Sequence, residues 1–390
     1  MLKEKVIFCY LLLFRVVFAI FKLSPQKQKV TIVTSFEENA WYLHQEMVKQ
    51  KVPFKVIFLC KPSLLKGFNE KFGEASIIPF ETPNFIYWCK GIYHLATSQA
   101  VIVDNYYAFL SVVTFKKNVE CIQIWHAAGA LKKFGLEDKT IVNRSNVAIK
   151  RFKKVYENFH KVVVGSEAMA NIFLDSFGLS KKNILRTGIP RTDFFYEKEE
   201  QAEVKQYFYQ KYPVLANKKL ILYAPTFRDM ELDQYDIQLD INQMYHALKD
   251  DYLLLIKLHP AVKNNHNYQK LYPDFVYDFS EYRGINELLV IVDFLISDYS
   301  SVPFEYALLN KPMIFYPYDL DLYQKERGVI PDYIQEVPGP VVFGTAEIIR
   351  LIKNNQFNLE RIREFSHKWN EYSVGKSSSN LISYVINKVH

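Results

Sequence analysis

Three strand-like runs in this chain end in residue types that acid–base and phosphate chemistry requires. One apolar run ends just before His126, a second ends just before His259, and a third is followed by the hydroxyl pair Ser300 and Ser301. In an open α/β sheet, ligands bind at the carboxyl ends of the strands. These strand ends therefore predict one shared cleft that carries two imidazoles and two hydroxyls.

His126 is followed by the small residues 127–130 and then by Lys132 and Lys133. Because the pKa of an imidazole lies near neutral pH, a neutral ring here could take a proton from a hydroxyl nucleophile. Small residues let a substrate approach the backbone closely, and the two lysines could hold a phosphate. A hydrogen-bonded core histidine beside two solvated lysines explains the same pattern, and spacing alone does not separate the two interpretations.

His259 lies two residues after Lys257, and the alternation of a strand places both side chains on one face. An imidazole and an ammonium on one face could brace a diphosphate while charge develops on its leaving group. The structural alternative is a strand-end histidine that is fixed by the turn at Pro260.

The segment 297–316 is typical of a turn, a helix and a strand that follow a buried strand. Pro303 suits the first helical turn, where no N–H is needed, and the free N–H groups of a helix start can bind an anion. We expect Asp298, Ser300 and Ser301 to lie at this anion site. If the two serines only cap the helix, no ligand is needed to explain them.

Thr226, Arg228 and Glu305 are further candidates for the site. Arg228 could bind a phosphate with two hydrogen bonds, or it could form an ion pair of little energetic weight with Asp229. Glu305 lies one helical turn after the serine pair and could receive a ribose hydroxyl or simply face water.

Asp104 and Asn105 end another strand-like run, where a carboxylate could orient a base or a substrate hydroxyl. The commoner role of such a residue is to cap a loop. The sequence holds no HExxH, Walker A or GxGxxG motif. We therefore expect neither a divalent metal nor another cofactor.

Composition and charge bound the class of the protein. The chain has 390 residues, of which 49% are hydrophobic and 23% charged, enough for two or three globular domains. Its net charge of +7 favours anionic partners, but no basic arm and no RNA-binding motif is present, so nucleic acid is not expected. The four cysteines lie in apolar surroundings without a CxxC pair, which predicts buried free thiols in a reducing compartment.

Residues 1–23 are apolar apart from a few charged side chains, among them Lys5, Arg15 and Lys22. No small-residue cleavage pattern follows, and the apolar run is near the short limit for a membrane span and is interrupted by Arg15. We predict a helix in the membrane interface whose basic side chains reach the head groups. A first helix packed into the protein is the alternative.

From residue 29 onward, short apolar runs alternate with helical patterns. Ser166 is predicted to cap a helix, and Thr345, Asn358 and Ser377 are candidate starts for the helices of the C-terminal tail. The predicted strands cover residues 30–34, 54–59, 100–104, 121–125, 160–165, 220–224, 252–258, 294–296 and 312–316. Continuous Val/Ile-rich runs of this kind are typical of parallel strands that are covered on both faces. We predict one α/β domain over 24–190, a second over 191–370 and a C-terminal helix over 371–390.

Several of these segments resemble one known family. They are WHAAGALKKFGLED (125–138), YAPTFRD (223–229), KLHP (257–260), SDYSSVPFEYALLNKP (297–312), GSEAMANIFLDSFG (165–178) and KWNEYSVGKSSSNL (368–381). Together they resemble the CDP-glycerol glycerophosphotransferase family of teichoic acid synthesis. The short chain, the apolar N-terminus and the Ala-Ala-Gly after the first histidine look most like the glycerol-phosphate primase branch. The polymerase branch more often has Gly-Thr-Pro at that place and a longer chain.

The resemblance implies a GT-B-like fold, in which two Rossmann-like doubly wound domains face a central cleft. The implied reaction transfers sn-glycerol 3-phosphate from CDP-glycerol to the ManNAc hydroxyl of ManNAc-GlcNAc-diphospho-undecaprenol and releases CMP. The implied place is the cytoplasmic face of the cell membrane, with contact to other teichoic acid enzymes. A poly(glycerol phosphate) polymerase of the same family, a GT-B nucleotide-sugar glycosyltransferase and a non-catalytic membrane-bound assembly factor are the alternatives.

The resemblance also implies roles for the candidate residues. His126 would be the general base on the acceptor hydroxyl, and His259 would hold the diphosphate. Glu305 would be placed toward the cytidine ribose, by analogy with GT-B folds. The other residues assigned to the substrate site are Lys132, Thr226, Arg228, Lys257, Asp298, Ser300 and Ser301.

Overall fold

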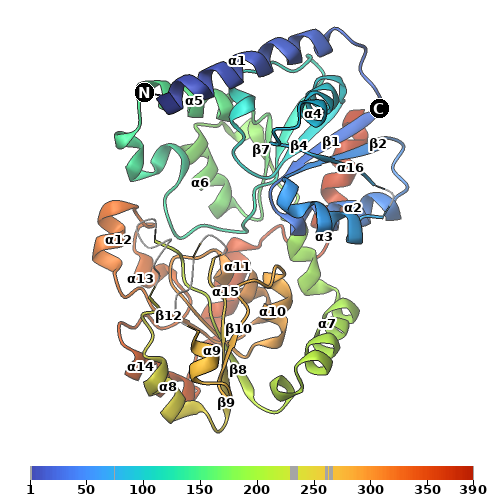
Figure 1. The fold of residues 1–390 in the computed structure, drawn as a ribbon. Coiled ribbons are helices and arrows are strands. Elements are labelled where there is room, and N and C mark those ends of the chain that lie inside the picture. The colour runs from blue at the N-terminus through green and yellow to red at the C-terminus, as the bar shows by residue number, and fades with distance from the viewer. Residues whose placement is uncertain (1, 74, 229–235, 260–261, 263–266, 390) are drawn as a thin grey trace. The chain divides into compact units, whose positions relative to one another are not determined.

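The computed structural model of the chain describes residues 2–73, 75–228, 236–259, 262 and 267–389. The described residues form two compact units, which Figure 1 draws in the colour order of the chain. Unit 1 comprises Met1–His126, Phe134–Asp193 and Glu371–His390. Unit 2 comprises Ala127–Lys133 and Phe194–Asn370. The chain therefore passes into unit 2 at the peptide bond that follows His126, and returns to unit 1 seven residues later.

Unit 1 is built on a parallel sheet, which has seven strands among the described residues, in the order β3-β2-β1-β4-β5-β6-β7. The strands are β1 (Lys29–Thr34), β2 (Lys55–Cys60), β3 (Ser76–Pro79), β4 (Ala100–Val103), β5 (Glu120–Gln123), β6 (Lys161–Val163) and β7 (Ile184–Leu185). All six residues of β1 are buried, as expected for a central parallel strand with helices on both faces.

The helices of unit 1 lie on both sides of its sheet, with α1 on the outside (Figure 1). They are α1 (Leu2–Lys22), α2 (Glu37–Lys49), α3 (Leu65–Lys71), α4 (Phe85–Thr97), α5 (Asn146–Glu157), α6 (Glu167–Phe177) and α16 (Ser377–Val389). The ends of α6 show how the sequence fixes a helix. Its first turn is capped because the Ser166 hydroxyl accepts from the Met169 amide, and it ends at Gly178 in the left-handed conformation.

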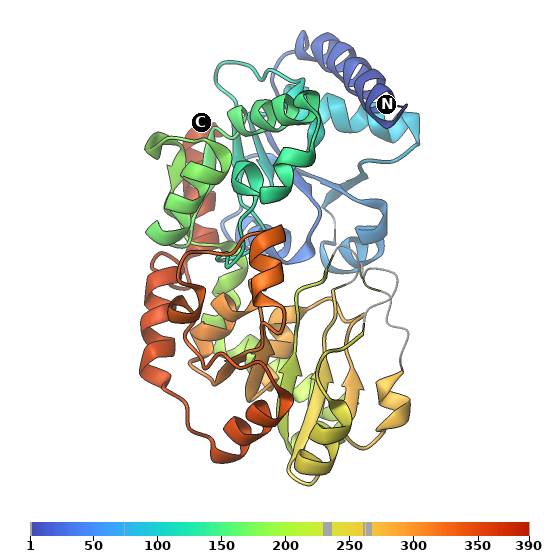
Figure 2. The same cartoon turned by 90° about the vertical axis from the view of Figure 1, so that its left-hand side faces the viewer.

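Unit 2 is built on a second parallel sheet, with five strands among the described residues, in the order β10-β9-β8-β11-β12. The strands are β8 (Lys219–Tyr223), β9 (Tyr252–Ile256), β10 (Val276–Asp278), β11 (Phe294–Ser297) and β12 (Met313–Phe315). Figure 2 shows the same ribbon turned by 90° about the vertical axis. Alternate residues of the strands, such as Ile221 and Tyr223, pack with α8 and α14 in one buried cluster.

The helices of unit 2 are mostly short. They are α7 (Lys198–Lys211), α8 (Ile241–Leu248), α9 (Tyr268–Leu271), α10 (Ile285–Ile291), α11 (Val302–Tyr306), α12 (Leu320–Glu326), α13 (Tyr333–Glu336), α14 (Thr345–Asn354) and α15 (Leu359–Trp369). The predicted cap at Asn358 is confirmed, because its side chain accepts from the Arg361 amide.

The predicted α/β class is therefore confirmed, and each predicted strand is present, with its ends within two residues of the expected ones. The strands β3, β7 and β10 were not predicted, nor were the helices α3, α4, α5, α9, α12 and α13. β3, β7 and β10 are two to four residues long, so they hold too few residues for a periodic pattern. The prediction that all cysteines are buried is wrong for Cys9, which is exposed, and for Cys89, which is half-buried. Cys9 lies on α1, which is apolar on its outer face as well as on its packed face.

Within the described part of the chain, none of the helices combines the length and apolar character that a membrane crossing needs. One side of α1 packs into unit 1 through Leu11, Phe14 and Phe18, which are all buried. Phe14 stacks on Phe109 with ring centroids 5.1 Å apart. The opposite side of α1 remains exposed and apolar, so the helix is docked on unit 1 without being enclosed by it.

Candidate active site

In unit 1, His126 follows β5 in a tightly held stretch of backbone. The preceding residue, Trp125, has φ of +54°, a left-handed conformation that is strained for a bulky side chain by about 1–3 kcal/mol. Its carbonyl accepts from the Asn39 side-chain amide at 2.9 Å. The imidazole lies against the Phe36 ring at 4.7 Å and the Trp125 ring at 4.4 Å between centroids. These contacts hold the backbone carbonyl that precedes His126 and the plane of its ring.

The hydrogen bond of the His126 ring decides which nitrogen can act as a base. Its Nδ1 lies 3.1 Å from the backbone carbonyl oxygen of Asp104. A carbonyl can only accept, so in the neutral ring Nδ1 carries the proton and donates it. Nε2 then presents a lone pair, which is the state that a general base requires.

The Asp104 carboxylate is buried and ties the end of β4 to the end of β1. It accepts hydrogen bonds from the Thr34 hydroxyl, the Ser35 and Phe36 amides and the Tyr107 hydroxyl, at 2.7–3.0 Å. Burial raises the pKa of this carboxyl to about 6, and the hydrogen bonds oppose the rise. The interpretation of Asp104 as a loop cap is therefore confirmed. The cap also holds two groups that contact the His126 ring, which are the backbone carbonyl of Asp104 and the side chain of Phe36.

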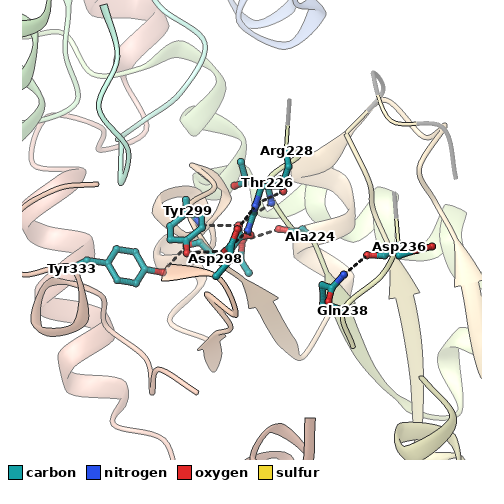
Figure 3. Close-up of polar contacts among 10 residues, drawn as sticks. Ala224, Thr226, Arg228, Asp236, Gln238, Asp298, Tyr299 and Tyr333 are labelled. Atoms are coloured by element: carbon teal, nitrogen blue, oxygen red, sulfur yellow. Dashed lines mark hydrogen bonds and ion pairs between the residues drawn. The ribbon is translucent and has the colours of Figure 1, made fainter. Parts of the chain in front are cut away.

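In unit 2, Thr226, Arg228 and Asp298 come together at the ends of β8 and β11 (Figure 3). The Asp298 carboxylate is buried and accepts from the Thr226 amide at 2.8 Å, the Tyr299 amide at 2.6 Å and the Arg228 guanidinium at 3.1 Å. The Tyr333 hydroxyl donates to the Asp298 carbonyl at 2.9 Å. Asp298 therefore holds the turn before the serine pair through contacts with the protein's own groups.

The Arg228 guanidinium also binds Asp319 through two hydrogen bonds of 2.8 Å, in the fork geometry that carboxylates favour. The rings of Tyr299, Tyr318 and Tyr323 surround it at 4.9–5.1 Å from their centroids. Burial acts to lower the pKa of this guanidinium, but its two carboxylate partners raise it overall. The alternative partner Asp229 lies outside the described residues.

The serine pair begins α11, which has five residues. The Ser300 hydroxyl accepts from the Val302 amide at 3.3 Å, whereas Ser301 starts the helix without a side-chain cap. Pro303 lies in the first turn, as predicted. The capping interpretation thus holds for Ser300, whereas the Ser301 hydroxyl does not cap the helix.

His259 and Lys132 are brought together in unit 2 by the ring of Phe227. The exposed imidazole packs on this ring at 4.5 Å between centroids, and the Lys132 ammonium lies 5.7 Å from the ring centroid. Partial desolvation lowers the pKa of His259, and the charges of Lys132 and Lys257 lower it further. Both effects favour the neutral form of the ring. Lys257 donates to the Ser280 carbonyl at 2.8 Å, and the expected turn residue Pro260 lies outside the described residues.

Glu305 is fully buried, so of the two alternatives stated for it, the one in which it simply faces water is wrong. Its Oε1 accepts from the amide of Ala128 at 3.3 Å, inside unit 2. The small residues after His126 have a structural reason as well, because a Cβ on Gly129 would lie 2.4 Å from the Phe304 ring. They pack against α11.

Sequence reasoning missed three residues of the site, Asp319 in unit 2 and Phe36 and Asn39 in unit 1. Asp319 follows β12, the strand beside β11, in the run Tyr-Pro-Tyr-Asp, and its position after a strand was the available signal. Phe36 and Asn39 follow β1 and contact His126 and the Trp125 carbonyl. Their signal was the same, since parallel strands end at one edge of the sheet.

The family model described as CDP-Glycerol:Poly(glycerophosphate) glycerophosphotransferase matches residues 16–387. The chain belongs to this family. A teichoic acid glycerol-phosphate primase of Bacillus subtilis (strain 168) is 39% identical over 381 residues, which are 98% of this chain and 97% of that protein. A teichoic acid poly(ribitol-phosphate) polymerase of Bacillus spizizenii (strain ATCC 23059 / NRRL B-14472 / W23) is 36% identical over 96% of this chain but only 59% of its own length.

Solved structures agree on the fold of this glycerophosphotransferase. The wall teichoic acid polymerase TagF superposes with a TM-score of 0.79 at 21% identity, over 100% of this chain and 98% of that one. UDP-GlcNAc 2-epimerase from Neisseria meningitidis superposes with a TM-score of 0.60 at 16% identity, over 92% of this chain and all of that one. The predicted GT-B-like fold is confirmed, and so is the predicted membership in the glycerophosphotransferase family.

Proposed function

We propose that this glycerophosphotransferase moves sn-glycerol 3-phosphate from CDP-glycerol to the ManNAc hydroxyl of a ManNAc-GlcNAc disaccharide on undecaprenyl diphosphate, and that it adds one unit. The observation that supports the single addition is the likeness to a glycerol-phosphate primase, which is 39% identical over 97% of that protein. A poly(ribitol-phosphate) polymerase is less similar, at 36% identity over 59% of its length.

The proposed reaction begins with His126, whose Nε2 accepts the proton of the acceptor hydroxyl. The acceptor oxygen bonds to the phosphorus that carries the glycerol. The bond between that phosphorus and the bridging oxygen breaks, and CMP leaves with that oxygen. The proton stays on the imidazole until water removes it. Because little covalent chemistry falls to the protein, positioning and charge stabilisation supply most of the rate.

On the donor side, we assign the diphosphate to His259, Lys132 and the serine pair of unit 2. A neutral imidazole can donate one N–H to a phosphate oxygen, and the Lys132 charge nearby compensates negative charge on the leaving CMP. The Ser301 hydroxyl and the amides that start α11 offer further donors. Thr226, Arg228 and Asp298 hold the turn that presents them.

The deciding experiment incubates the purified protein with CDP-glycerol and a soluble lipid-linked disaccharide analogue, and measures CMP and the mass of the product. We expect CMP together with one added glycerol phosphate. A ladder of products would favour a polymerase, consumption of a UDP-sugar would favour a glycosyltransferase, and no turnover of either donor would favour an assembly factor.

Replacing His259 by alanine should weaken CDP-glycerol binding about ten-fold, because one hydrogen bond to a charged group is worth about 1.5 kcal/mol. It should also lower kcat, since the lost contact strengthens as the leaving group gains charge. Calorimetric titration and initial rates separate the two effects. His246→Ala, an exposed histidine on α8 in the same unit, is the matched control. Wild-type affinity in His259→Ala would remove this residue from the donor site.

We also propose that α1 places the enzyme on the cytoplasmic face of the membrane, where the lipid-linked acceptor is found. The support is its outer face, on which large apolar side chains are about half exposed or more: Val6, Phe8, Leu12, Leu13, Val16 and Ile20. Phe85 and Ile86 at the start of α4 are 64% and 65% exposed, and α4 packs on α1 through Trp88. Lys5 and Arg15 are exposed and can reach anionic head groups.

The double substitution Phe8→Glu and Leu12→Glu should strongly reduce sedimentation with vesicles that contain anionic lipid. Each side chain that no longer inserts removes about 1.5–3 kcal/mol of apolar burial. Val48→Glu with Val374→Glu is the matched control, because these exposed valines of unit 1 lie on α2 and just before α16, outside α1 and α4. Equal loss of binding in both pairs would show that added charge, and not the α1 face, explains the effect.

A further inference from the structure

The segment 127–133, which we call the strap, is fastened to unit 2 on two sides. On one side it pairs with the chain after α12: the Ile330 amide donates to the Leu131 carbonyl at 2.9 Å, and the Lys133 amide donates to the Gly328 carbonyl at 3.0 Å. An antiparallel bridge joins Lys132 and Val329. These hydrogen bonds join backbone groups, so they do not depend on the identity of the side chains.

The other side of the strap lies on α11. The Glu305 carboxylate accepts from the Ala128 amide at 3.3 Å. Gly129 touches the ring of Phe304, which is buried between Phe365 and Trp369 at centroid distances of 5.2 and 4.7 Å. Because Phe304 is enclosed, it cannot give way to a strap that shifts. The strap therefore lies between the rigid Phe304 ring on one side and the backbone hydrogen bonds on the other. Glu305 makes a polar contact with it on the Phe304 side.

The strap begins at the residue that follows His126. Consecutive Cα atoms are separated by a fixed distance of about 3.8 Å, so a displacement of Ala128 is passed to the backbone of His126 within two residues. The same short helix that begins with Ser300 and Ser301 thus holds the chain that leads away from the base.

We propose that Glu305 is a positioning residue for His126, which acts through the Ala128 amide and the strap. This rests on the proposed function of His126 as the base. This role differs from that of a ribose ligand, which the analogy with GT-B folds suggests for Glu305. A ribose ligand would act on the affinity for the nucleotide, whereas a positioning residue acts on the rate of transfer in the saturated enzyme.

The test compares Glu305→Ala and Glu305→Gln in the full chain. Glu305→Ala removes the acceptor for Ala128 and should lower kcat about 100-fold, the effect of a misplacement of about 1 Å, while the Kd for CDP-glycerol stays nearly constant. Glu305→Gln keeps an oxygen that can accept from the Ala128 amide, so it should retain most of the rate. Calorimetry gives Kd for CDP-glycerol and for its 2′-deoxyribose analogue.

Gly129→Ala tests the same strap from its other contact and should lower kcat in the same way, without touching Glu305. Its matched control is Gly339→Ala, also in unit 2, where the added Cβ would lie 2.1 Å from the Met313 carbonyl oxygen. That control should lower thermal stability but leave kcat per folded molecule unchanged. If Glu305→Ala fails to fold, Gly129→Ala and Glu305→Gln still carry the test.

The proposal is overturned if the Glu305 variants bind CDP-glycerol ten-fold or more weakly with kcat unchanged, and lose the preference for the ribose over its 2′-deoxy analogue. It is also overturned if the Gly129 and Glu305 variants keep both kcat and Kd. A failure of the proposed function is a different result, because the wild-type protein itself would then release no CMP from CDP-glycerol.

Discussion

Replacing His126 by alanine is expected to reduce glycerol phosphate transfer by about 10²- to 10⁴-fold, the usual contribution of a general base. CDP-glycerol should still bind, because the donor contacts that we assign lie in unit 2 and His126 belongs to unit 1. The readouts are CMP release in the presence of the acceptor analogue and calorimetric titration with CDP-glycerol in its absence.

A second substitution at this position separates loss of the base from loss of the fold. Asparagine can place its side-chain N–H where Nδ1 donates to the Asp104 carbonyl, but it has no acceptor at the position of Nε2. His126→Asn should therefore be as inactive as His126→Ala and more stable to heat. His367→Ala, on the exposed face of α15, is the control for loss of an imidazole elsewhere. Normal turnover by well-folded His126→Asn would remove the base assignment.

The strands of this fold could be predicted from the sequence, because burial on both faces of a sheet produces runs of consecutive apolar residues. β9 is five buried residues in a row, and its predicted range differs from the observed one by two residues at one end. The positions of His126, His259 and the serine pair after strands were likewise visible, since a strand end is a local feature. For α1 the sequence left two interpretations open, a helix in the membrane interface and a helix packed into the protein, and the structure shows one packed face and one exposed apolar face.

The contacts that define the site were beyond such reasoning, because they join residues far apart in the chain. Arg228 and Asp319 are separated by 91 residues, and Ala128 and Glu305 by 177. No periodicity records a pairing at that separation. From local sequence alone, an arginine that binds phosphate cannot be distinguished from a buried structural arginine. Only the coordinates show that the Arg228 guanidinium binds carboxylates of the protein.

Those carboxylates make Arg228→Ala the substitution with the largest expected effect on stability. Its side chain is 10% exposed, and the side chains of Asp298 and Asp319 are 2% and 16% exposed. Removal of the cation leaves both carboxylates desolvated without their partner, which should lower the free energy of unfolding by about 3–5 kcal/mol. Chemical denaturation followed by circular dichroism measures the loss. The turn before Ser300 should loosen as well, so donor binding should weaken in the fraction that remains folded.

Two comparisons show whether the buried network is the cause. Arg186→Ala breaks an arginine–carboxylate pair with Glu167 in unit 1 whose side chains are 41% and 45% exposed, and it should change stability by less than about 1 kcal/mol. In the double substitution Arg228→Met with Asp298→Asn, one carboxylate charge is removed together with the cation. Its loss of stability should therefore be smaller than the sum of the two single losses, because the two residues interact directly. An Arg228→Ala protein that is as stable as the wild type but binds CDP-glycerol weakly would contradict this account. That result would favour Arg228 as a phosphate ligand, since the guanidinium could then leave Asp298 and Asp319 and bind the phosphates of CDP-glycerol at little cost in free energy.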